Sequence, residues 1–240
     1  MTAERRGIQE TGPGWGFRFW LLFSCVLALS AVVCLGYALA QGVVFPGDGE
    51  LLAAWQRART PAFDAVMVGV SYIGYFLPVF GPLVVVVTLV LWRWRGPGEG
   101  LFVGAWTVFA YVVSLGVKDI VRRTRPSGDD VWVHRLLSDF GYPSQHVVSF
   151  MVFFGLLCYL AATRWRGEPI RWPTLVICGL LMLLVGPSRV YLAAHWPTDV
   201  LGGYLLGYSL WAVAVLTEAR FTPLLTSTEP GMAGEGEAKE

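Results

Sequence analysis

Six long apolar segments, separated by shorter polar ones, dominate the pattern of the chain. A segment needs about 20 mainly apolar residues to cross the hydrocarbon core of a bilayer as a helix. Six ranges meet or approach that length: 19–40, 77–92, 101–121, 147–162, 172–190 and 200–217. The pattern therefore predicts an all-α protein, a compact bundle of six transmembrane helices.

The polar stretch between the first two spans also carries local patterns. Residues 51–58 are weakly amphipathic and are expected to lie along the membrane interface. A short helix from Phe63 is expected to lead into the second span, which is interrupted by Pro78 and Pro82. The first span is too long for the apolar part of a signal peptide, so it is expected to be retained.

These segments define one domain with two flanking ends. Residues 1–18 are expected to form a cytoplasmic N-terminal segment, and residues 19–220 the six-helix domain. Residues 221–240 are rich in Gly, Glu, Ser and Thr and are predicted to be a disordered cytoplasmic tail. The layout leaves no room for a separate soluble domain.

Composition supports the membrane prediction and narrows the partners. Of the 240 residues, 55% are hydrophobic and 15% charged, against about 25% charged in an average soluble domain. A net charge of +1 gives no support for a nucleic-acid partner. The four cysteines lie in apolar segments and are interpreted as small buried hydrophobic residues, because their spacing fits neither a disulfide framework nor a metal site.

The distribution of basic residues predicts the orientation. With the N-terminus inside, ten Lys and Arg residues fall on the inner side and eight on the outer side. The positive-inside rule favours this orientation once the outer basic residues that belong to or border three polar clusters are set aside. All three clusters then lie at the outer ends of the spans.

The first cluster runs from Lys118 to Pro126. Lys118, Arg122 and Arg125 recur at i, i+4 and i+7, so a continuing helix would place them along one face. Each arginine can bind two phosphate oxygens at once, and lysine contributes a compact positive charge. Pro126 would end the helix. The alternative is a basic anchor at the membrane interface that also complements the helix dipole.

The second cluster is Pro143-Ser144-Gln145-His146, directly before an apolar segment. Ser144 occupies the position of a helix N-cap, and His146 falls in the first turn. The free N–H groups of a first turn bind anions, so a phosphate pocket is one interpretation. An ordinary capped helix with an interfacial histidine is the other.

The third cluster is Ser188-Arg189, followed by His195 and Asp199. Pro197 suits the first turn of a helix, which places Asp199 near its N-terminus. A carboxylate there can accept the Nδ1 proton of the imidazole and leave Nε2 as a nucleophile. A capping aspartate beside an interfacial histidine is the alternative, and the specific spacing favours the catalytic interpretation.

Together, Lys-x6-Arg-Pro, Pro-Ser-x-His and Ser-Arg-x5-His-x3-Asp resemble the type 2 phosphatidic acid phosphatase superfamily, which also contains the vanadium haloperoxidases. The resemblance implies that the phosphoryl oxygens are bound by Lys118, Arg125, Arg189, Ser144 and the backbone N–H of Gln145. It further implies three catalytic roles: nucleophile for His195, positioning of that histidine for Asp199, and general acid for His146. No metal or other cofactor is expected, because the cations would neutralise the charge of the transition state.

One position departs from the family pattern, which usually reads Pro-Ser-Gly-His. Gln145 stands at the glycine position. The backbone N–H survives this change, while the added side chain could narrow the pocket or bind the head group. His134 matches no motif position and is expected at the surface, and Arg122 and Arg123 are expected to contact either substrate or lipid phosphates.

The sequence thus predicts an integral membrane lipid phosphatase of a bacterial inner membrane, with its site facing the extracytoplasmic side. The candidate substrates are a polyprenyl diphosphate such as undecaprenyl diphosphate, phosphatidic acid and phosphatidylglycerophosphate; the oligomeric state is left open. The expected reaction forms a phosphohistidine on His195, which water then hydrolyses. A phosphotransferase would instead pass the phosphoryl group of this intermediate to a lipid or sugar hydroxyl. A haloperoxidase would hold vanadate, but the resemblance implies that such relatives are soluble. A lipid-phosphate transporter could dispense with His195 or Asp199, and both are present.

Overall fold

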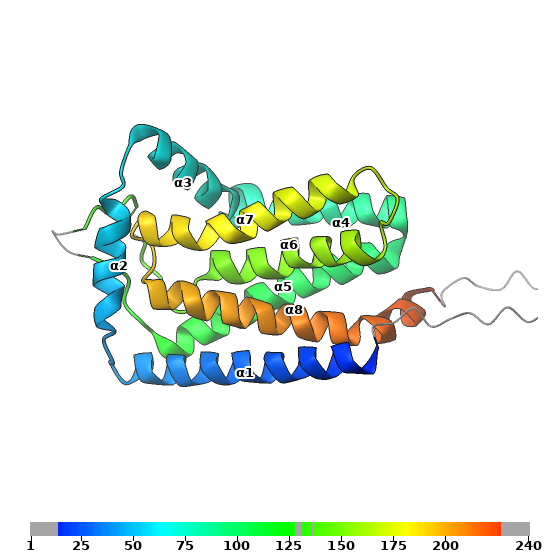
Figure 1. Cartoon of the computed structure of the whole chain (residues 1–240), viewed down its shortest axis with the longest axis horizontal. Helices are drawn as coiled ribbons and strands as arrows, with labels where there is room; N and C mark the ends of the chain where they lie inside the picture. Colours follow the sequence, from blue (N-terminus) through cyan, green and yellow to red (C-terminus); the bar gives the residue numbers. More distant parts are fainter. Residues whose placement is uncertain (1–13, 128–130, 136, 227–240) are drawn as a thin grey trace, which may run out of the picture.

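The computed structural model describes residues 14–127, 131–135 and 137–226, and its regular elements there are helices (Figure 1). They are, in order, α1 (Trp15–Ala40), α2 (Pro46–Gln56), α3 (Pro61–Ile73), the π-helical turn η1 (Phe76–Phe80), α4 (Gly81–Arg95), α5 (Pro97–Val121), α6 (Gln145–Thr163), α7 (Arg171–Tyr191) and α8 (Pro197–Thr226).

Six of the described segments are long and apolar enough to cross a membrane, which confirms the predicted bundle. They are Trp15–Ala40, Pro78–Arg95, Pro97–Val121, Gln145–Thr163, Arg171–Tyr191 and Pro197–Glu218. The observed helices extend the predicted spans at most of their ends. At the C-terminal end, α8 continues to Thr226, so residues 221–226 of the predicted tail are helical. The remaining predictions for residues 1–13 and 227–240 lie outside the described residues.

Helix α6 forms the centre of the bundle and packs against α5, α7 and α8. Its apolar side chains are buried on all sides, as expected of a helix without a polar face. Phe150 and Phe153 surround Phe80 of η1, with ring centroids 5.7 and 5.4 Å apart. This aromatic cluster fixes the start of α4 against the central helix.

One end of the bundle gathers the polar clusters. Figure 1 shows α2 crossing the end at which α1, α5 and α7 finish and α8 begins. The short helix α3 packs on α7 beside it. Because consecutive helices run in opposite directions, loops far apart in the sequence meet here.

Helix α7 contains Pro187, which lacks the N–H that would bond to the carbonyl of Leu183. The hydroxyl of Tyr204 on α8 lies 3.4 Å from this carbonyl and also bonds to its neighbours in the helix. It accepts a hydrogen bond from the N–H of Gly186 at 3.1 Å and donates to the carbonyl of Met182 at 2.8 Å. Freed backbone groups in a membrane helix need such partners, so Tyr204 stabilises the turn before Ser188 and Arg189.

Candidate active site

Three basic side chains converge at the polar end from two helices and a loop. Lys118 lies in the last turn of α5, Arg125 in the loop after it, and Arg189 in the last turn of α7. Lys118 and Arg189 are buried, with 3% and 1% of their surface exposed. Buried cations need anionic or hydrogen-bonding partners. The loop before α6 provides some of these partners.

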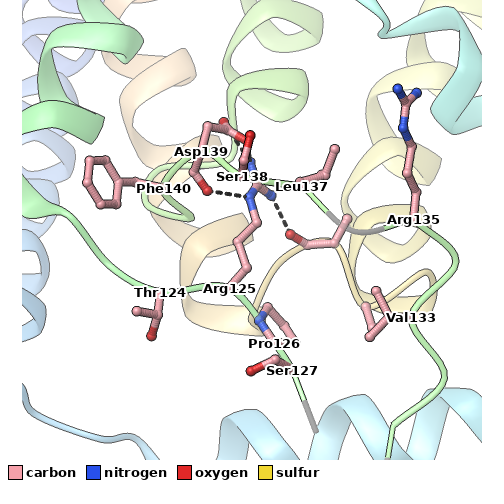
Figure 2. Close-up of a pocket in the computed structure, with 12 residues that line it drawn as sticks. Thr124, Arg125, Pro126, Ser127, Val133, Arg135, Leu137, Ser138, Asp139 and Phe140 are labelled. Atoms are coloured by element: carbon pink, nitrogen blue, oxygen red, sulfur yellow. Dashed lines mark hydrogen bonds and ion pairs between the residues drawn. The ribbon is translucent and has the colours of Figure 1, made fainter.

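Asp139, in the loop before α6, pairs with two of these cations. Its Oδ2 lies 3.0 Å from Nζ of Lys118 and 2.8 Å from Nη2 of Arg125. Oδ1 accepts a second hydrogen bond from the same Nη2 at 2.8 Å, and the backbone carbonyl of Asp139 accepts from Nε at 2.9 Å. Lys118 also donates to the carbonyl of Phe140. Figure 2 shows Arg125 reaching toward this loop.

Arg125 also contacts His195 on its other side. Its Nη1 donates to the carbonyl of Ala194 and lies 2.9 Å from Nε2 of His195. A guanidinium has only donors, so Nε2 accepts this hydrogen bond and the ring proton is on Nδ1. This tautomer leaves the lone pair of Nε2 directed toward the cationic cluster.

The buried imidazole of His195 lies beside the carboxylate of Asp199, but the two atoms do not form a hydrogen bond. Nδ1 is 3.6 Å from Oδ2, longer than a hydrogen bond, and Nδ1 has no partner among the described residues. Burial lowers the pKa of His195 well below its usual value, and the positive charges of Arg125, Arg189 and Lys118 lower it further. The imidazole is therefore neutral at pH 7.

Asp199 is held by two donors. The N–H of Trp196 donates to Oδ2 at 3.0 Å, and Nη1 of Arg123 donates to Oδ1 at 2.6 Å. Arg123 also reaches Oγ1 of Thr198 at 2.5 Å and Oδ2 of Asp48 at 2.6 Å. Asp48 in turn accepts from the N–H of Thr198 at 2.9 Å, so the first turn of α2 is fastened to the first turn of α8.

The N-terminus of α6 completes the site. Ser144 is the N-cap of α6, as predicted, but its hydroxyl makes no capping hydrogen bond. Its N–H donates to the backbone carbonyl of Asp199 at 3.0 Å. His146 meets Tyr75 edge-on at 5.6 Å between ring centroids. A Cβ at Gly74 would lie 2.1 Å from Cδ2 of His146, so only glycine leaves room for this imidazole.

Several buried polar atoms at this end lack hydrogen-bond partners. Among the described residues, eight buried side-chain atoms have none, and five of them belong to this site: Ser144 Oγ, Gln145 Nε2, His146 Nε2, Arg189 Nε and His195 Nδ1. Arg189 otherwise donates to Ser71. Buried polar groups are normally paired, so this concentration marks a position that a polar ligand would fill.

A cavity of about 300 Å³ opens beside Arg125 and Asp139. Figure 2 shows both side chains among its lining residues, with Phe140 and Thr124 on the same side. The cavity borders the cationic cluster at Arg125, whereas Lys118 and Arg189 are not among its lining residues.

The structure corrects one prediction about the first cluster. Helix α5 ends at Val121 because Arg122 adopts a left-handed conformation (φ 52°), so Lys118, Arg122 and Arg125 do not share a helical face. Arg122 is exposed, whereas Arg123 points inward to Asp48 and Asp199. The guanidinium of Arg123 therefore pairs with two carboxylates of the protein itself. His134 is exposed, as predicted.

The sequence interpretation missed two residues of the site, Asp48 and Asp139, and the inward contacts of Arg123. Asp48 lies in the polar stretch just before residues 51–58, and Asp139 lies between the first and second motifs. No motif marks either residue. Asp139 lies 14 positions after Arg125, so the sequence carried no signal that the two would pair.

Comparison with known proteins gives a consistent set of relatives. The family model described as PAP2 superfamily matches residues 99–223. The chain is 26% identical over 199 residues to phosphatidylglycerophosphatase B of Bacillus subtilis, covering 81% of this chain and 89% of the relative. It is 27% identical over 211 residues to undecaprenyl-diphosphatase of Sulfolobus acidocaldarius, covering 85% and 92%.

The fold agrees with these relatives. The crystal structure of a transmembrane PAP2-type phosphatidylglycerolphosphate phosphatase from Bacillus subtilis superposes with a TM-score of 0.62 at 25% identity, covering 77% of this chain and 92% of that one. The family match spans more than half of the 240 residues and includes all three motifs. The chain belongs to the PAP2 superfamily.

Proposed function

We propose that this membrane phosphatase hydrolyses the terminal phosphate of a lipid phosphomonoester or diphosphate through a phosphohistidine formed on His195. The observation that carries the proposal is the contact of 2.9 Å between Nη1 of Arg125 and Nε2 of His195. It places a neutral nitrogen nucleophile next to a side chain suited to bind phosphoryl oxygens. The unpaired polar atoms around it support the same position for the phosphate.

In the first step, the lone pair of His195 Nε2 attacks the terminal phosphorus. The bond from phosphorus to the lipid oxygen breaks, and His146 donates a proton to that oxygen. Lys118, Arg125 and Arg189 neutralise the equatorial oxygens of the transition state. The Nδ1 proton stays on the ring and faces Asp199, which stabilises the positive charge that develops on the imidazole.

In the second step, neutral His146 takes a proton from water, and the oxygen of that water attacks phosphorus. The phosphorus–nitrogen bond breaks, inorganic phosphate leaves and His195 regains its lone pair. His146 thus ends the cycle protonated, as it began. Each of these steps uses side chains of the chain itself, so we propose that hydrolysis proceeds without a metal ion.

The substrate classes proposed are polyprenyl diphosphate, phosphatidic acid and phosphatidylglycerophosphate. All three present a terminal phosphate to the same cations, and relatives are named for phosphatidylglycerophosphate and undecaprenyl diphosphate. The distribution of Lys and Arg supports a site on the extracytoplasmic face of a bacterial inner membrane.

The test is phosphate release by purified protein in detergent with EDTA, using the three substrates in turn. His195→Ala should abolish release, and His134→Ala, at an exposed histidine, should retain it. Release that survives in His195→Ala would contradict the proposal. Release that depends on an added lipid or sugar hydroxyl would identify a phosphotransferase instead.

A further inference from the structure

The carboxylate of Asp139 binds the cations that are proposed to bind substrate phosphate. A single oxygen, Oδ2, lies 3.0 Å from Lys118 Nζ and 2.8 Å from Arg125 Nη2. A phosphate oxygen would make the same pair of contacts, because carboxylate and phosphate both match the guanidinium donors. The carboxylate therefore occupies part of the position that substrate needs.

The side chain of Asp139 is placed to leave this position. It is 54% exposed, while its partner Lys118 is only 4% exposed, and it lines the open cavity rather than the packed core (Figure 2). Asp139 thus neutralises part of the charge of Lys118 and Arg125 in the resting protein, while its own side chain stays at the surface. A ligand that enters through the cavity meets the carboxylate first.

We propose that Asp139 is a specificity-determining residue: its carboxylate covers Lys118 and Arg125 until a terminal phosphate dianion displaces it, and it thereby excludes the phosphodiester head groups of bulk lipids. This inference rests on the proposed function, since it assumes that Lys118 and Arg125 bind the substrate phosphate.

Charge explains the selection. A terminal phosphate carries about −1.5 to −2 at pH 7, whereas a phosphodiester carries a single negative charge, the same as the carboxylate. A dianion is attracted to these cations more strongly than the carboxylate that it replaces, whereas a diester carries the same single charge as the carboxylate and gains no attraction by the exchange. Burial raises the pKa of Asp139, but Lys118 and Arg125 outweigh that effect and hold the pKa below its usual value, so the carboxylate stays ionised at neutral pH.

This device suits an enzyme that is surrounded by lipid. Phosphodiester head groups greatly outnumber any phosphomonoester or diphosphate in a bilayer. Without Asp139, the cations would bind the common diesters and the rare substrate would have to compete with them. With Asp139, every anion must displace the carboxylate before it can bind. Only a more highly charged group gains enough attraction to offset the free energy of that displacement.

The first test measures binding of inorganic phosphate at pH 7 by calorimetry, in a glycoside detergent without phospholipid. Asp139→Asn should bind phosphate about tenfold more tightly than the unmodified protein, because removing a competing closed state raises the apparent affinity. Asp139→Glu keeps the charge and should stay within about twofold. Asp119→Asn removes the same charge from an exposed position next to Lys118 and should also stay within about twofold.

The second test adds phosphatidylglycerol to the micelles as a diester competitor. Phosphate affinity of the unmodified protein should not change, and that of Asp139→Asn should fall as the lipid is added. Equal or weaker phosphate binding by Asp139→Asn, or equal competition in both proteins, would overturn the inference while leaving the phosphate site intact. Phosphate binding by none of the proteins would overturn the proposed site and the inference together.

Discussion

Arg123 donates a 2.6 Å hydrogen bond to Asp199, the carboxylate that lies beside Nδ1 of the proposed nucleophile. The same guanidinium pairs with Asp48 on α2, so one buried cation serves two buried acids. Arg123 does not face the position proposed for phosphate. We interpret it as a positioning residue that acts through Asp199.

Arg123→Gln should destabilise the protein and slow the reaction. The substitution leaves two buried carboxylates without a cation, which costs about 3–5 kcal/mol, so the Tm in detergent should fall sharply. Arg122→Gln is the matched control, because Arg122 is exposed and such surface changes stay within about 0.5 kcal/mol. Equal Tm values for the two variants would contradict the proposed role of Arg123.

Gly74→Ala should reduce kcat, measured at a temperature below the Tm of the variant. A Cβ at this position would lie 2.1 Å from His146 Cδ2, so the imidazole must move away from its place in the site. A Cβ at Gly69, within α3, the helix that ends just before Gly74, would meet no atom within 4 Å, so Gly69→Ala should keep full activity. Unchanged kcat in Gly74→Ala would show that the observed position of His146 is not needed.

The titration of His195 should show a midpoint well below 6.5. Its pKa is lowered first by burial and then by Arg125 and its neighbours, so the neutral form persists as the pH falls. The unfolded protein binds the proton near pH 6.5, and the folded protein does not. The contribution of a neutral His195 to stability is therefore present above about pH 6.5 and is lost as the pH falls below that value.

Histidine ¹⁵N NMR of the purified protein, with His195→Gln used to assign the signal, measures this midpoint directly. The unprotonated nitrogen should be Nε2, as its contact with Arg125 requires. A midpoint at or above 6.5, or a proton on Nε2 at pH 7, would contradict the described geometry.

Tyr204→Phe should lower the free energy of unfolding by about 1–3 kcal/mol, because it leaves the Gly186 N–H and the Met182 carbonyl without their shared partner. The effect should be visible as a lower Tm. Because the turn before Arg189 would also be less well held, phosphate binding by Arg189 should weaken. Tyr37→Phe removes a hydroxyl from an exposed ring and serves as the control. A Tm equal to that of the control would show that the hydroxyl of Tyr204 is dispensable.

The sequence alone predicted the bundle because each span carries its own apolar signal. It also placed the three clusters at one end, since alternate helix ends must meet in a bundle of antiparallel neighbours. The N-cap position of Ser144 and the start of α8 at Pro197 are confirmed, as both depend on local chemistry.

The parts that the sequence did not reveal depend on distant contacts. Asp48 meets Arg123 from 75 positions away, and no periodicity records such a pair. The predicted span and α5 both end at residue 121, but the helix does not continue to Pro126, because the chain turns at Arg122 and Arg123 points inward. Asp139 was missed because its role depends on the loop conformation around Arg125.

The central claim is that His195 becomes phosphorylated during turnover. It is tested most directly by quenching the purified protein in base within milliseconds of mixing with substrate, and locating the phosphoryl group by peptide mass spectrometry. We predict an acid-labile phosphohistidine at position 195 that disappears as inorganic phosphate forms. Rapid phosphate release without phosphate on His195, under conditions that preserve phosphohistidine, would contradict the mechanism.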